Sequence, residues 1–114
     1  MMEEKSVINL RGSDCSPELE EEFNKWYRDV HIPMLMESGE IKHIKRYRRM
    51  SADEKYPKFL VIYQFENREA FERYEASPAL AAAVEDVKNR WRDGGYESRW
   101  RVQYELMESW DRDK

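Results

Sequence analysis

The sequence is poor in the residues that form covalent cross-links or bind metals. Its 114 residues include one cysteine, two histidines, four glycines and four prolines. The lone thiol, Cys15, excludes an intrachain disulfide and fits a reducing compartment. No apolar run approaches the ~20 residues that cross a bilayer, and the first residues lack the apolar core of a signal peptide. We therefore expect a cytoplasmic protein that has no membrane partner.

Several motifs of cofactor and metal chemistry are also missing. The sequence has no phosphate-binding glycine loop, no zinc-ligand spacing and no Ser-His-Asp signature, so we expect neither a metal nor another cofactor. The net charge of −4 argues against a nucleic-acid partner, which needs a clustered basic surface. The basic stretch Lys42–Arg49 is a local exception. It could attract an acidic partner, although a solvated strand edge is the simpler explanation.

Aromatic and charged residues are plentiful, at 13% and 39%, which predicts a folded chain with a well-solvated surface. The length suits a single domain, residues 1–114. Hydrophobic periodicity and turn residues predict the order strand, helix, strand, strand, helix, strand. The expected strands are Val7–Arg11, Ile41–Met50 (with a bulge), Lys58–Phe65 and Trp100–Trp110; residues 12–16 form a loop, one helix runs from Pro17 to Gly39, a short helix is capped by Asn67, and a later helix runs from Ser77 to Gly94.

This order predicts an α+β fold of the ferredoxin-like βαββαβ type, a four-stranded antiparallel sheet with its helices on one face. The first long helix carries a core-facing stripe, and Pro33 predicts a kink near His31. At about 100° per residue, His31 falls at the edge of this stripe. The stripe comprises Leu19, Phe23, Trp26, Val30 and Met34.

The third strand is too apolar for a sheet with one solvated face. Six of the seven residues Phe59–Phe65 are apolar, whereas a half-buried strand alternates apolar with polar residues. Because the helices cover only one face, we expect a second copy of the chain to cover the other, giving a homodimer. A monomer with a hydrophobic central strand is the alternative.

The last strand could contribute polar side chains to a pocket on one face of the sheet. If its apolar face, from Trp100 to Leu106, meets the helices, then Arg101 and Gln103 face the opposite layer. There they could line a pocket with Gln64 of the third strand. A solvated sheet face is an equally good explanation.

The chain resembles the dimeric α+β-barrel superfamily, and its EthD-like branch in particular. The resemblance covers nearly the whole chain, and it rests on the element order and on Trp-Tyr-x-x-x-His-x-Pro in the first helix, with Trp26, Tyr27, His31 and Pro33. Ser77-Pro78-Ala79-Leu80 and the aromatic last strand add to it. It implies a dimeric α+β barrel with a cavity between sheet and helices. Haem-degrading members hold iron through a histidine on the late helix, and this chain has none after His43.

The superfamily includes isomerases, cyclases and cofactor-free monooxygenases, so fold alone does not fix function. Tyr27 and His31 lie one helical turn apart and are the candidate catalytic pair, because histidine exchanges protons near neutral pH. The expected ligand is a small apolar carbonyl, lactone or aromatic compound, acted on by proton transfer. The alternative is a non-catalytic, ligand-binding or stress-related dimer in which His31 has a structural role. Candidate ligand-binding residues are Trp26, His43, Tyr47, Gln64, Arg101 and Gln103.

Overall fold

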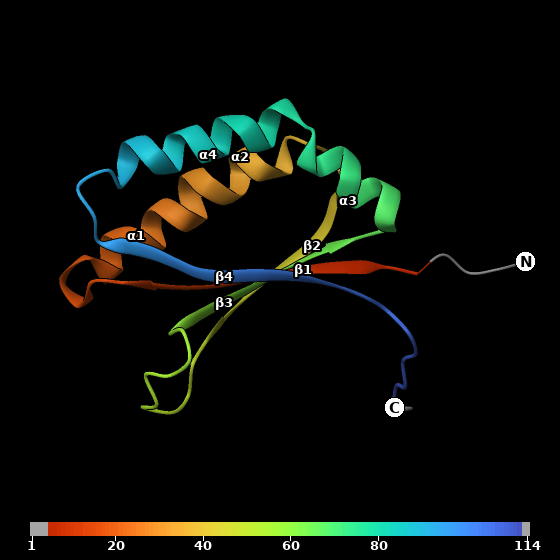
Figure 1. The fold of residues 1–114 in the computed structure, drawn as a ribbon, viewed down its shortest axis with the longest axis horizontal. Helices are drawn as coiled ribbons and strands as arrows, with labels where there is room; N and C mark the ends of the chain where they lie inside the picture. The colour runs from red at the N-terminus through yellow and green to blue at the C-terminus, as the bar shows by residue number, and fades with distance from the viewer. Residues whose placement is uncertain (1–4, 113–114) are drawn as a thin grey trace, which may run out of the picture.

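The fold is a curved antiparallel sheet with its helices gathered on one face (Figure 1). The computed structural model describes residues 5–112, so the first four and the last two residues of the predicted 1–114 domain lie outside the described part. The prediction about a signal peptide concerns the first of these residues and stays a prediction. The elements are β1 (Val7–Cys15), the 3₁₀ turn η1 (Pro17–Leu19), α1 (Glu20–Trp26), the π-helical segment η2 (Tyr27–His31), α2 (Ile32–Met36), β2 (Ile41–Arg48), β3 (Phe59–Phe65), α3 (Arg68–Glu75), α4 (Pro78–Arg90) and β4 (Tyr96–Glu105).

The sheet order is β2-β3-β1-β4, and each neighbouring pair is antiparallel. This arrangement confirms the predicted ferredoxin-like α+β class. The bulge predicted in the second strand is present as a shift of register between Ile41 and His43. The bulge lets Ile41 and Ile44 both face the helices although they are an odd number of positions apart.

Side chains of β3 alternate between the two faces of the sheet. Phe59, Val61, Tyr63 and Phe65 are buried beneath the helices, whereas the residues between them are only partly buried. Phe23 of α1 packs on this layer, with its ring centroid 5.5 Å from that of Phe59. The core therefore lies between the sheet and the helices, and aromatic rings fill much of it.

The long first helix contains a π turn that the sequence pattern did not predict. The Ile32 amide donates a hydrogen bond to the Tyr27 carbonyl, five residues earlier. Pro33 has no amide hydrogen to donate, so regular α-helical bonding is already interrupted at this point. The extra residue shifts the buried stripe by one position, from Val30 to His31 and from Met34 to Leu35.

Several predicted boundaries of strands are wrong. β1 continues to Cys15 through residues predicted to form a loop, and β4 runs from Tyr96 to Glu105 rather than from Trp100 to Trp110. Gly12 explains the first error, because a Cβ built on it would lie 2.6 Å from Pro57 Cγ. The glycine permits close approach of a neighbouring segment within a strand, and does not mark a turn.

The predicted helix caps are largely correct. The Asn67 side chain accepts a hydrogen bond from the Ala70 amide at 2.8 Å, and Ser77 Oγ accepts one from the Leu80 amide at 3.1 Å. Ser16 precedes the first helical turn, but its side chain makes no capping hydrogen bond. α3 and α4 therefore begin where the sequence placed them.

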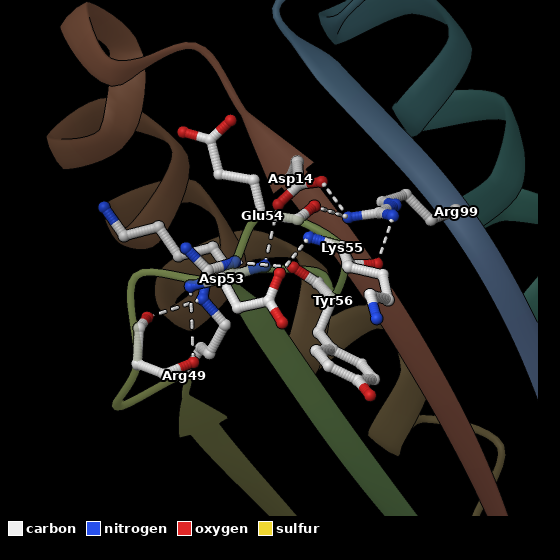
Figure 2. A network of polar contacts seen from close by, with 9 residues as sticks. Asp14, Arg49, Asp53, Glu54, Lys55, Tyr56 and Arg99 are labelled. Atoms are coloured by element: carbon white, nitrogen blue, oxygen red, sulfur yellow. Dashed lines mark hydrogen bonds and ion pairs between the residues drawn. The ribbon is translucent and has the colours of Figure 1, made fainter.

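Two arginines hold the loop between β2 and β3 in place (Figure 2). Arg49 donates hydrogen bonds to the carbonyls of Ser51 and Tyr56, at 2.8 and 2.5 Å. Arg99 of β4 donates to the Lys55 carbonyl at 2.8 Å and pairs with Asp14 at 3.1 Å. These contacts fix the loop on the side of the sheet that faces away from the helices (Figure 1).

The side chains of β4 face the opposite way from the arrangement considered in the sequence, in which the apolar row of this strand meets the helices. Arg101 binds Glu75 of α3 and Gln103 binds Asn9, so both face the helical side. Trp100, Val102 and Tyr104 therefore face the opposite side, which we call the outer face. The outer face also carries partly buried apolar residues of the two central strands, namely Ile8, Leu10, Leu60 and Ile62.

Candidate functional site

A cavity of about 230 Å³ lies between the sheet and α4. Its floor comes from the helix-facing side of β1, β3 and β4, and its walls come from η2, α2, α3 and α4. A dry cavity of ~150 Å³ accepts benzene, so this one suits a small substituted ring. The lining residues are Asn9, Arg11, His31, Leu35, Tyr63, Phe71, Tyr74, Glu75, Leu80, Ala83, Val84, Val87, Lys88, Tyr96, Ser98 and Arg101.

His31 lines the cavity and brings an imidazole to it. Its side chain is 4% exposed, and Nδ1 is buried without a hydrogen-bond partner among the described residues. Burial lowers the pKa of His31 to about 4, and the charge of Arg11 acts in the same direction. The imidazole is therefore neutral at pH 7, with a ring nitrogen able to accept or donate a hydrogen bond.

Tyr27 is not part of the cavity lining, but its hydroxyl is hydrogen-bonded to that of Tyr63, which is. The two phenolic oxygens are 2.6 Å apart, and Tyr63 is the one that lines the cavity. Burial raises the pKa of Tyr27 to about 12 and that of Tyr63 well above its ordinary value. Both phenols therefore keep their protons at neutral pH. When Tyr27 donates to Tyr63, the Tyr63 proton is left for a ligand.

Trp26 supports the histidine ring and is not a cavity-lining residue. Its ring stacks on His31 with centroids 4.8 Å apart and planes 26° apart. The indole Nε1 donates to an Asp86 carboxylate oxygen at 2.9 Å, which anchors the ring to α4. Tyr27 meets the imidazole edge-on, also at 4.8 Å. The motif in the first helix thus holds His31 in one orientation from two sides.

The remaining sequence candidates divide between the faces of the sheet. Arg101 lines the cavity with His31. Gln103 faces the helices as well, but it lies beside a separate, shallower depression near Phe71. His43 and Tyr47 pair in register with Gln64 and Leu60, so these candidates lie on the outer face. The structure therefore brings only part of the predicted set together.

Sequence reasoning missed most of the polar cavity residues, among them Asn9, Arg11, Tyr63 and Tyr74. Asn9 and Arg11 alternate with apolar residues along β1, and this period of two was the available signal. Tyr63 was counted only as an apolar member of its strand. Burial raises the pKa of Tyr74 to about 12, so its hydroxyl also stays protonated.

The Cys15 thiol lies in an environment that disfavours its ionisation. Burial, and then the Glu20 carboxylate, raise the pKa of Cys15, so the thiolate is disfavoured. Within residues 5–112, no cluster of three or more His, Cys, Asp or Glu side chains could hold a metal ion. None of the helices in the same range has the length and apolar character that crossing a membrane requires.

Solved structures with similar folds were found at low sequence identity. HapK from Hahella chejuensis matches with a TM-score of 0.70 and 13% identity, covering 95% of this chain and 99% of its own. An ethyl tert-butyl ether D (EthD) family protein from Bacillus halodurans matches with a TM-score of 0.66 and 13% identity, covering 90% and 99%. SnoaB, a cofactor-independent oxygenase from Streptomyces nogalater, matches with a TM-score of 0.56 and 14% identity, covering 95% and 97%.

These likenesses confirm the resemblance to the dimeric α+β-barrel superfamily, including its EthD-like branch, at the level of the fold. Comparison with curated proteins gives no match. A family model described as a domain of unknown function, DUF4286, matches residues 12–103, which is most of the chain. The protein therefore belongs to the DUF4286 family.

Proposed function

We propose that this protein binds a small carbonyl, lactone or aromatic compound in the cavity and moves a proton on it without a cofactor. The observation that carries the proposal is that His31 and Tyr63 both line the cavity. Nδ1 of His31 has no partner among the described residues and can accept a proton, and the Tyr63 hydroxyl can donate a hydrogen bond. A base and a hydrogen-bond donor are the two groups that enolisation of a carbonyl requires.

The proposed step conserves atoms and electrons. His31 takes a proton from the carbon next to the carbonyl, and the electron pair moves onto the carbonyl oxygen, which Tyr63 stabilises by donating a hydrogen bond. Return of the proton to the same carbon gives exchange, and return to a conjugated carbon gives isomerisation. SnoaB, which has a similar fold, is a cofactor-independent oxygenase, so chemistry without a cofactor occurs in a protein of this shape.

A non-catalytic binding function is the second candidate, and the pKa of His31 favours it. An imidazole with a pKa of about 4 is a weak base, so it deprotonates carbon less readily than an ordinary histidine does. In this alternative, His31 and Tyr63 orient a ligand by hydrogen bonds alone.

Proton exchange measured by NMR separates the two functions. The wild-type protein is incubated in D₂O with phenylacetone and α-angelica lactone, and loss of the α-proton signal is followed. Catalysis predicts exchange that depends on the protein and that falls about a hundredfold or more in His31→Gln. Tyr63→Phe should slow exchange, whereas Tyr56→Phe, at an exposed loop position, should not. Binding without exchange of either compound would favour the non-catalytic function.

We further propose that the active form is a homodimer joined through the outer face. Trp100, Val102, Tyr104 and Leu106 are large apolar residues exposed in one row along and just beyond β4. Partly buried Leu60 and Ile62 continue this surface onto β3. An apolar sheet face of this extent is typical of a protein interface. A second copy fits it by two-fold symmetry, since the same strands would meet each other.

A further inference from the structure

The cavity contains an arginine whose charge has no acidic partner among the described residues. Arg11 of β1 lines the cavity, and its Nε is buried without a hydrogen-bond partner in the same part of the chain. Nδ1 of His31, which also lines the cavity, is likewise unpartnered there. A buried donor without an acceptor destabilises the protein, and a buried charge does so more strongly. The unpartnered Nε of Arg11 therefore marks a position where an external acceptor would stabilise the protein.

The neighbour of Arg11 across the sheet makes the charge imbalance larger. Arg11 pairs in register with Arg101 of β4, so two guanidinium groups approach the cavity from adjacent strands. Like charges directly opposite each other on antiparallel strands repel. Within residues 5–112, Glu75 is the only acidic residue in the cavity lining, and it already pairs with Arg101 at 2.8 Å. The described lining therefore leaves no carboxylate to pair with Arg11.

The other polar groups of the cavity reinforce this preference. Lys88 adds a third cation to the lining. Tyr63 and Tyr74 keep their protons at neutral pH because burial raises the pKa of each. His31 is neutral and so does not add repulsive positive charge. A cavity rich in cations and O–H donors is suited to a ligand that supplies negative charge and acceptor oxygens.

We propose that the ligand of this cavity is a small ring compound bearing a carboxylate, and that Arg11 binds the carboxylate. This inference rests on the proposed function of the cavity and names the class of its ligand. The guanidinium fork of arginine matches the two oxygens of a carboxylate. The ring then lies among the apolar residues of α4, where Leu80, Ala83 and Val87 line the cavity.

Benzoate and benzamide provide the test, because they have similar shapes and differ in charge. Their dissociation constants are measured by calorimetry at low ionic strength. Benzoate should bind about tenfold more tightly than benzamide, as expected for charge-assisted hydrogen bonds. Arg11→Gln should remove this preference, so that benzoate and benzamide bind with similar dissociation constants. Arg92→Gln, an exposed change after α4, is the matched control and should keep the preference.

A second measurement needs no variant of Arg11. Benzoate bound beside His31 should raise the imidazole pKa, seen as a shift in the NMR titration of the wild-type ring, whereas benzamide should not. Ala83→Leu should fill the cavity and abolish the binding of both compounds, because Ala83 is fully buried in its wall.

The outcomes separate this inference from the proposed function. Equal binding of the two compounds, both lost in Ala83→Leu, would overturn the carboxylate inference and leave the ligand-binding cavity standing. A preference for benzoate that survives in Arg11→Gln would also overturn it, as would absence of benzoate binding at millimolar concentration. Proton exchange on the uncharged phenylacetone tests the proposed function independently.

Discussion

The buried histidine should make the stability of the protein depend strongly on pH. The pKa of His31 is lowered from 6.5 to about 4 in the folded protein, chiefly by burial. Between these values the unfolded chain binds a proton that the folded chain does not, so the free energy of unfolding falls as the pH falls. The stability that the folded protein gains by keeping His31 neutral is fully present above pH 6.5, and it is lost progressively as the pH falls towards 4.

The size of the effect follows from the pKa shift. One pKa unit corresponds to about 1.4 kcal/mol, so a shift from 6.5 to about 4 corresponds to roughly 3 kcal/mol. Because the side chain is only 4% exposed, solvent does little to reduce this figure. A loss of this size is a large part of the total stability of a small domain.

Urea unfolding at a series of pH values tests this reasoning. The wild-type protein, His31→Gln and the control His43→Gln are compared at one fixed protein concentration. Wild type and the control should each lose roughly 3 kcal/mol more than His31→Gln between about pH 7.5 and about pH 4. His43 is exposed, which makes it the histidine control for a change outside the core. Equal slopes for all three proteins, or an NMR pKa of His31 near 6.5, would refute the reasoning.

Three further predictions concern the fold and the outer face. Gly12→Ala should lower the free energy of unfolding by about 1–3 kcal/mol in urea titrations, because the new Cβ would lie 2.6 Å from Pro57 Cγ; an unchanged midpoint would contradict this packing. Asn67→Ala should cost about 1 kcal/mol by the same assay, since the side chain caps α3, and Asn67→Ser should restore most of it. Tyr104→Glu should halve the mass measured by light scattering if the outer face joins two copies, whereas Met36→Glu, an exposed change on α2, should not.

The sequence predicted the class of fold because its signals are local. Neighbours within a few positions determine the Asn67 and Ser77 caps and the strand character of β3, and each of these predictions is confirmed. Gly12 was misread because its reason is not local. The glycine is needed where Pro57, far away in the chain, packs against β1.

The candidate site was only partly predictable for two physical reasons. Periodicity distinguishes the two faces of a strand, but it does not say which face meets the helices when both faces carry apolar residues. Arg101 was therefore expected on the side opposite to the one it occupies. Regular helical geometry placed His31 at the edge of the core stripe, and the π turn moved it into the cavity wall.

The π turn accommodates one residue more than regular α-helical winding of this segment needs. Arg28 lies within η2 and is exposed, so its deletion would remove one residue from the turn without deleting any core side chain. Regular winding would then place His31 four residues after Trp26, on the same side of the helix. A one-codon deletion would therefore abolish the irregular turn while keeping the imidazole aligned with the indole and preserving every residue of the cavity lining.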